Sequence, residues 1–104
     1  MTFDEYEREA ARTANPSLDE RDRLMDAAAG LAEESGEVLG AVRKHAYFGH
    51  PLDVDRLRIE LGDALWCLAM TARAAGLTLD DVAAANIAKL RDRYPDGFDS
   101  EATR

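Results

Sequence analysis

The sequence has one cysteine, few aromatic residues and a marked shortage of basic residues. The single cysteine, Cys67, excludes an internal disulfide framework, and no Cys/His cluster suggests zinc, so we interpret Cys67 as a small buried hydrophobic residue. The 13 basic residues are outnumbered by 21 acidic ones, which gives a formal net charge of −8. Because a reader of duplex DNA needs a basic surface stripe, we expect no duplex nucleic acid partner.

Long apolar segments are missing as well. No run approaches the roughly 20 apolar residues that a membrane-spanning helix needs. The acidic start, Met1–Glu5, lacks the apolar region of a signal peptide. We therefore expect no membrane contact and a cytoplasmic location. A length of 104 residues, with 46% hydrophobic and 33% charged residues, is typical of a single domain. We expect its core within residues 17–98 and a flexible tail over residues 99–104.

Apolar residues recur at helical spacing, and no alternating strand pattern is present, so the sequence predicts an all-α fold with four helices. The first is expected over residues 3–14. The segment Ser17–Glu20 has the form of a capping box, which predicts that Ser17 is the N-cap of a second helix reaching about Ala46. Glycine and proline in Tyr47–Pro51 then predict a loop.

Capping residues also delimit the last two helices. Asp53 is the expected N-cap of a third helix that runs to about Ala75, and Gly76 is placed to end it. Thr78 is expected to begin the fourth helix, which the segment Tyr94–Gly97 closes.

Two neighbouring stripes run along the second predicted helix. The small residues of one stripe leave space around Glu34 and Glu37. The third helix is apolar nearly all round, and a helix of that kind is buried on all faces. We therefore expect a homo-oligomer with this helix near the interface, and we interpret Trp66 as a core or interface residue rather than a platform for a base. The main apolar stripe of the second helix comprises Leu24, Ala28, Leu31, Ser35, Val38 and Val42.

Two pairs of acidic residues, each three positions apart, are the main candidates for chemistry. Glu34 and Glu37 form one pair, and Glu60 and Asp63 form the other. Residues three apart lie on one face of a helix, separated by about 4.5 Å along its axis. If the two helices pack side by side, the four carboxylates converge on a site that suits Mg²⁺ or Mn²⁺. Spacing alone leaves open the alternative of solvated surface charges; the adjacent Glu33 projects away and is expected to be solvated or supporting.

Four polar residues are candidates for substrate contacts. Asn86 interrupts the apolar stripe of the fourth helix, and a buried asparagine needs hydrogen-bond partners. Lys89 and Arg93 follow it, and they can bind phosphate or simply complement the C-terminal end of the helix dipole. Lys44, two turns beyond Glu37, can likewise reach a phosphate or cap its own helix.

Three segments together resemble a known family: GLAEESGE at 30–37, ELGDALW at 60–66 and NIAKLRDRYP at 86–95. In this order they are similar to the MazG family of nucleoside triphosphate pyrophosphohydrolases in its short, single-domain form, over about residues 18–98. The resemblance implies a four-helix, all-α fold with a bundle completed by a homodimer or homotetramer, and a requirement for Mg²⁺.

The resemblance also implies roles for individual residues. Asn86 and Lys89 fall on positions that contact the nucleotide in relatives. The expected reaction is hydrolysis of a (deoxy)nucleoside triphosphate to the monophosphate and pyrophosphate, as in the clearance of unwanted nucleotides, with Glu34 or Glu37 as general base. The alternative is a non-catalytic helical module that senses nucleotides or binds a partner. The metal ligands of the family fall on Glu34, Glu37, Glu60 and Asp63.

Overall fold

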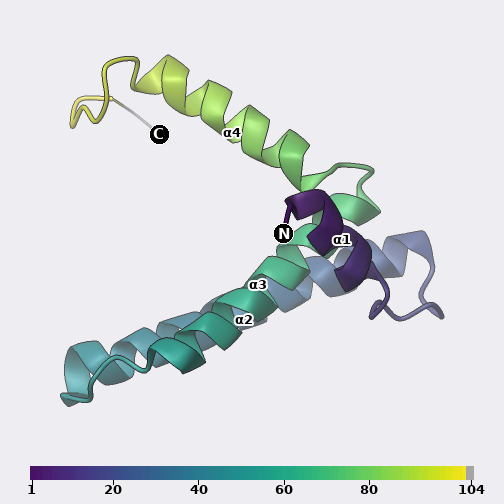
Figure 1. The fold of residues 1–104 in the computed structure, drawn as a ribbon, viewed down its shortest axis with the longest axis horizontal. Helices are drawn as coiled ribbons and strands as arrows, with labels where there is room; N and C mark the ends of the chain where they lie inside the picture. The colour runs from purple at the N-terminus through teal and green to yellow at the C-terminus, as the bar shows by residue number, and fades with distance from the viewer. Residues whose placement is uncertain (103–104) are drawn as a thin grey trace.

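The computed structural model describes residues 1–102, and these form four helices joined by short connections (Figure 1). The helices are α1 (Phe3–Ala11), α2 (Glu20–Phe48), α3 (Val54–Ala74) and α4 (Leu79–Arg93). The all-α prediction is confirmed, and no strand occurs within the described residues. None of the helices in this part of the chain has the length and hydrophobicity needed to cross a membrane. The expectation of a flexible tail includes residues 103–104, which lie outside the described residues.

The predicted caps of α3 and α4 are confirmed. The Asp53 carboxylate accepts a hydrogen bond of 3.0 Å from the backbone N–H of Arg56. Thr78 and Asp81 form a reciprocal capping box, with two hydrogen bonds of 3.0 Å. Hydrogen bonds from the backbone and the side chain of Thr78 hold the pKa of Asp81 below its ordinary value. Gly76 follows the last residues of α3 with φ of 78°, a left-handed conformation that favours glycine.

The predicted start of α2 is wrong by two residues. The N-cap is Asp19, whose side chain accepts a hydrogen bond of 2.8 Å from the N–H of Asp22. Ser17 is held in the preceding turn, because its N–H donates to the side chain of Asn15 over 3.0 Å. The first helix is also shorter than the predicted 3–14, since α1 ends at Ala11.

The predicted end of α2 at about Ala46 is two residues short. Tyr47 and Phe48, assigned to a loop from the sequence, belong to the last turn of α2. The helix stops at Gly49, which has φ of 71°. Glycine adopts this left-handed conformation without the steric cost that other residues meet, so it sets the end of the helix.

α2 and α3 form a long antiparallel hairpin, which is the most extensive helix contact in the chain (Figure 1). The small stripe of α2 faces α3: Ala27 and Ala41 are buried, and a Cβ added to Gly30 would lie 3.0 Å from the sulfur of Cys67. The expectation of a buried Cys67 is thus met. The main apolar stripe of α2 does not form the core, because its ends at Leu24 and Val42 are 40% and 39% exposed.

α1 packs across the hairpin at the end opposite the α2–α3 connection, and it also contacts α4. The indole N–H of Trp66 donates to the Thr13 hydroxyl over 2.9 Å, which attaches the end of α1 to α3. Glu7 on α1 is buried, and its carboxylate accepts a hydrogen bond of 3.2 Å from the N–H of Leu79, the first residue of α4. A carboxylate there also complements the positive end of the helix dipole. The core gathers at this junction and comprises Ala10, Ala27, Ala69, Met70 and Leu79.

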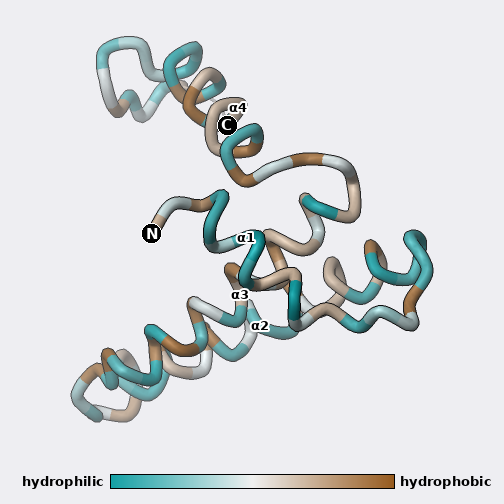
Figure 2. The backbone as a smooth tube through the Cα atoms, turned by 45° about the vertical axis from the view of Figure 1, so that its right-hand side comes forward, coloured by the Kyte–Doolittle hydropathy of each residue, from teal (hydrophilic) through white to brown (hydrophobic). Residues whose placement is uncertain are grey.

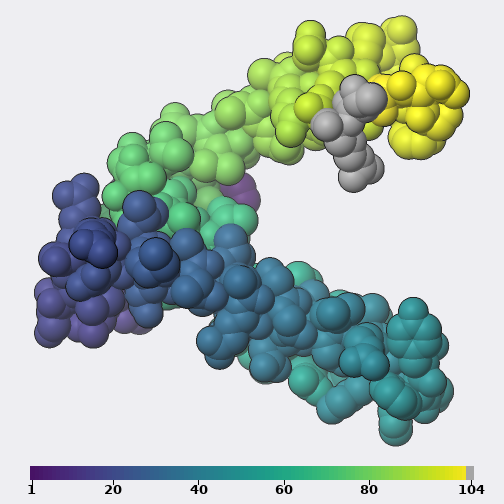
Figure 3. Space-filling view, turned by 180° about the vertical axis from the view of Figure 1, so that it is seen from behind, coloured from purple at the N-terminus to yellow at the C-terminus, as the bar shows by residue number. Residues whose placement is uncertain are grey.

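Beyond this junction, α4 diverges from the hairpin, so that the molecule has the shape of a V (Figures 1 and 3). Residues 80–92 are all exposed, and hydrophobic residues recur along this uncovered helix (Figure 2). The radius of gyration is 16.5 Å, whereas about 13 Å is expected for a compact domain of this length. A single chain therefore leaves one of its four helices without a packing partner along most of its length.

Candidate metal and nucleotide site

Three of the four predicted acids meet on the α2–α3 hairpin. Glu34, Glu60 and Asp63 each offer a carboxylate oxygen, and these oxygens all lie within 4.8 Å of one another. Glu34 and Glu60 are half-buried, whereas Asp63 is exposed. The antiparallel packing of α2 on α3 places residues 34 and 63 at the same level, and the neighbouring Gly30 allows the two helices to approach closely. We call these three residues the carboxylate cluster.

The electrostatics of the carboxylate cluster favour a bound cation. The pKa of Glu34 is raised, first by desolvation and then by the negative charges of Asp63, Glu33, Glu60 and Glu37. Like charges so close disfavour ionisation unless a positive charge lies between them. Three carboxylates provide hard oxygen ligands, which suit Mg²⁺ and Mn²⁺ and leave coordination positions for water and phosphate. The donor set thus fits a hard divalent cation.

Glu37 lies beside the carboxylate cluster but outside it. Its side chain is 53% exposed, and one of its oxygens lies 4.0 Å from the guanidinium of Arg56. The same guanidinium lies 3.7 Å from an oxygen of Glu60, one turn along α3. Sequence reasoning missed Arg56, although its spacing of four residues from Glu60 is a signal for an ion pair on a helix.

The predicted nucleotide-contacting residues of α4 do not approach the cluster within one chain. Asn86 and Lys89 are exposed, Arg93 is half-buried, and within the described residues α4 makes no helix contact with α2. The interpretation of Asn86 as a core-facing residue is therefore not met by a single chain. Lys44 lies on α2 beyond Glu37, where it lines a pocket beside the α2–α3 connection.

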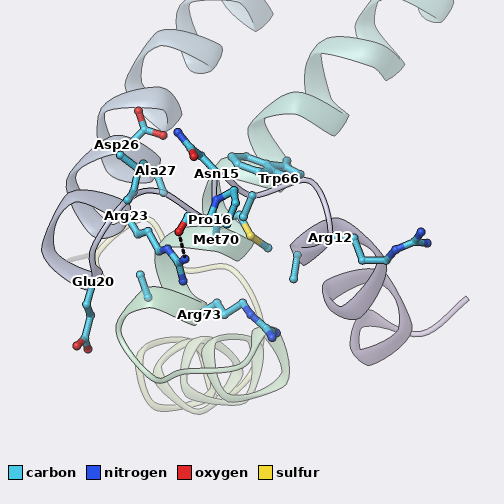
Figure 4. Close-up of a pocket in the computed structure, with 14 residues that line it drawn as sticks. Arg12, Asn15, Pro16, Glu20, Arg23, Asp26, Ala27, Trp66, Met70 and Arg73 are labelled. Atoms are coloured by element: carbon cyan, nitrogen blue, oxygen red, sulfur yellow. Dashed lines mark hydrogen bonds between the residues drawn. The ribbon is translucent and has the colours of Figure 1, made fainter.

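Two pockets flank the carboxylate cluster along the hairpin. One has a volume of about 790 Å³ and lies between the α1–α2 connection and the α2–α3 pair. Trp66 and Met70 line it together with Arg23 and Arg73, as Figure 4 shows. The other has a volume of about 550 Å³ and is lined by Lys44, His50 and Arg56, among others. The acids therefore lie between these two sets of residues along both helices.

An all-α chain with clustered carboxylates on an antiparallel helix pair is typical of helical proteins that bind a divalent cation. The family model of the MazG nucleotide pyrophosphohydrolase domain matches residues 24–98. The chain belongs to this family. Searches of curated proteins and of solved structures returned no match.

Membership of the MazG family supports a general role as a nucleotide pyrophosphohydrolase, an enzyme that hydrolyses phosphoanhydride bonds. Proteins of this family act on nucleoside triphosphates and typically depend on a divalent metal. The carboxylate cluster lies within the matched residues, on the two helices that pack most extensively.

Proposed function

We propose that the protein is a Mg²⁺-dependent enzyme that hydrolyses (deoxy)nucleoside triphosphates to the monophosphate and pyrophosphate, and that Mn²⁺ can replace Mg²⁺. The observation that carries this proposal is the carboxylate cluster of Glu34, Glu60 and Asp63 in a chain of the MazG family. Such an activity suits the removal of unwanted nucleotides from the cellular pool.

The chemistry assigns distinct tasks to the acidic side chains. A divalent cation at the cluster would neutralise phosphate oxygens and lower the pKa of a water molecule. Glu34, Glu60 and Asp63 would hold the cation, and Glu37 would supply a fourth ligand after turning away from Arg56. Glu34 or Glu37 takes the proton of the water as its oxygen attacks the α-phosphorus. The bond from that phosphorus to the bridging oxygen breaks, and pyrophosphate leaves.

We further propose that the active form is a homodimer or homotetramer. The accessible surface of the chain is 7916 Å², whereas a compact protein of its mass exposes about 5,800 Å². The excess of about 2,000 Å² compares with the roughly 1,000 Å² or more per subunit that obligate homodimers bury. Ile87 and Leu90 on α4 are 45% and 41% exposed, and Ile59 and Leu61 on α3 are 64% and 51% exposed. These surfaces are suited to pack against another copy.

Assembly would also account for the position of the predicted substrate contacts. Asn86, Lys89 and Arg93 lie on α4, which within the described residues contacts α1 and α3 near its start and is exposed over residues 80–92. A second copy seated in the V would bring its own α4 towards the carboxylate cluster of the first. The site would then combine the acids of one chain with the cations of its neighbour.

The direct test is release of pyrophosphate from a panel of NTPs and dNTPs with Mg²⁺, for the wild type and for Glu37→Gln. We expect metal-dependent release by the wild type, reduced about 100-fold or more in the variant because a ligand or general base is lost. Activity that survives the substitution would contradict the assignment of Glu37. Absence of release from every nucleotide, with no shift of the melting temperature by Mg²⁺ and nucleotide, would contradict the enzymatic proposal itself.

A further inference from the structure

Charges of opposite sign are segregated along the seam between α2 and α3. On α2, Glu34 and Glu37 are followed by Lys44, and on α3 Arg56 precedes Glu60. Because the two helices are antiparallel, both cations lie at the end of the hairpin where α2 and α3 are connected. The acidic side chains therefore lie near the middle of the α2–α3 contact. The basic side chains, which can bind anions, lie beside the α2–α3 connection.

The pocket at this connection has the chemistry of an anion site. Its polar lining comes from Lys44, His50 and Arg56, and Phe48 and Pro51 add apolar surface. Asp53 also lines the pocket as its one carboxylate, and one oxygen of that carboxylate accepts the N–H of Arg56 as the N-cap of α3. The positive end of the α3 dipole and the negative end of the α2 dipole both lie at this connection, so the side chains rather than the helix dipoles supply its net positive character. Cationic side chains thus face one volume of about 550 Å³.

Arg56 belongs both to this pocket and to the acidic site. Its guanidinium lies 3.7 Å from Glu60 and 4.0 Å from Glu37. Arg56 also lines the pocket that contains Lys44, so it lies between the acids and Lys44. In this position it lies beside Glu37, which stands outside the carboxylate cluster, and it supplies part of the positive charge that the acids lack. Both ion pairs are long, at 3.7 and 4.0 Å, so neither fixes the guanidinium as a short bidentate pair would.

We propose that Arg56 is a displaceable counter-ion of the acidic site and that, with Lys44, it forms a subsite for the pyrophosphate end of the substrate. With a divalent cation held by Glu34, Glu60 and Asp63, the guanidinium of Arg56 would be free to turn into the pocket beside Lys44. Arginine suits this role because its planar guanidinium binds phosphate with two hydrogen bonds, whereas lysine adds a point charge. The subsite rests on the proposed hydrolysis, since it assigns the leaving group to the connection end of the hairpin.

The order of these sites also gives the substrate a direction. The phosphorus under attack lies between the nucleoside and the pyrophosphate, so the nucleoside extends from the acids away from the connection. The pocket lined by Trp66 and Met70 lies on that side. The two ends of the substrate therefore meet different surfaces. Lys44 and Arg56 line one pocket, whereas the other combines Trp66 and Met70 with charged side chains such as Arg23.

The experiment measures binding to the intact protein without turnover. Mn²⁺ binding is followed by electron paramagnetic resonance, and binding of inorganic pyrophosphate with Mg²⁺ is followed by calorimetry. Arg56→Gln is expected to bind Mn²⁺ about threefold more tightly, because its competitor is gone, and to bind pyrophosphate at least about tenfold more weakly. Lys44→Gln is expected to weaken pyrophosphate binding but to leave Mn²⁺ binding unchanged, because Lys44 pairs with none of the acids.

Arg58→Gln is the matched control, because Arg58 pairs with Asp55 on the exposed side of α3. It is expected to match the wild type in both measurements. Unchanged or weaker Mn²⁺ binding by Arg56→Gln, or wild-type pyrophosphate binding by both Arg56→Gln and Lys44→Gln, would overturn the proposal, provided that the melting temperatures show folded variants. A wild type that binds pyrophosphate in this pattern but hydrolyses no nucleotide would leave the subsite intact and contradict only the proposed function.

Discussion

Negative charges around a carboxyl group raise its pKa, and Glu34 lies among several carboxylates. Its pKa is raised in the metal-free chain by desolvation and by the surrounding negative charges. Just above the ordinary glutamate pKa, the folded chain therefore binds more protons than the unfolded chain. The free energy of unfolding must then fall as the pH rises through the interval between the ordinary and the raised pKa.

Substitution of Glu34 by glutamine is expected to remove this fall. At neutral pH the metal-free Glu34→Gln protein should melt at a higher temperature than the metal-free wild type, whereas added Mn²⁺ should stabilise the wild type more than the variant. Thermal melts from about pH 4 to pH 8, with chelator or with Mn²⁺, test both expectations. Glu9→Gln on α1, far from the cluster, should retain the pH profile of the wild type. An unchanged profile in Glu34→Gln would show that the acids do not interact as the geometry indicates.

At the level of the elements, the junction of α1, α3 and α4 depends on one buried carboxylate. Glu7→Ala would leave the N–H of Leu79 without its partner and would remove the charge that complements the start of α4. We expect the free energy of unfolding to fall by about 2 kcal/mol, and the Leu79 amide to exchange its hydrogen faster. Urea denaturation and hydrogen exchange measure the two effects.

Glu9→Ala is the control for this substitution, because Glu9 is exposed and its ion pair within the described residues is with Arg12, the C-cap of the same helix. Its effect should stay within about 0.5 kcal/mol. An equally small effect of Glu7→Ala would mean that the buried hydrogen bond does not hold α4 in place.

The helices could be predicted from the sequence because their signals are local. Asp53 and Thr78 each lie directly before an apolar periodic segment, and both are caps in the structure. Ser17 matched a capping pattern equally well, but Asn15 binds its N–H and Asp19 stands nearer to the helix. Competition between neighbouring caps depends on the turn that the chain adopts, and residue spacing does not contain that information.

The candidate site was only partly predictable for a related reason. Spacing placed Glu60 and Asp63 on one face of α3, and the packing of α2 brings Glu34 to them. Glu37 instead lies 4.0 Å from the guanidinium of Arg56, a residue of the other helix. The roles proposed for Asn86 and Lys89 require a neighbouring chain beside α4. The sequence contains no direct signal for the position of such a neighbour. Both assignments therefore depend on contacts between helices, which the spacing of residues along the sequence does not determine.

At the scale of the whole molecule, a second copy is expected to cover the exposed apolar side chains of α4. Leu90→Glu places a charge on the exposed apolar side of α4. We expect this variant to shift the protein towards monomer by about 100-fold in dissociation constant, because a buried charge without a partner is costly. Size-exclusion chromatography with light scattering measures the change, and Asp92→Ser on the same helix is the control.

Loss of assembly should be accompanied by loss of pyrophosphate release if the site is shared between chains. Mixing Glu34→Gln with Lys89→Gln subunits provides a direct check, because each mixed pair then contains one site with all its groups. Recovery of activity on mixing is expected. A monomeric wild type, or full activity of monomeric Leu90→Glu, would contradict the shared site.

The V shape also affects how the protein is maintained in a cell. None of the large side chains among the described residues is completely buried, and the core consists mainly of alanines with Cys67, Met70 and Leu79. On the proposed assembly, part of the free energy of folding comes from neighbours and follows mass action. A higher concentration of the chain would then raise the assembled fraction and with it the free energy of unfolding. Scarce chains lose structure together with activity, whereas abundant chains protect one another from degradation.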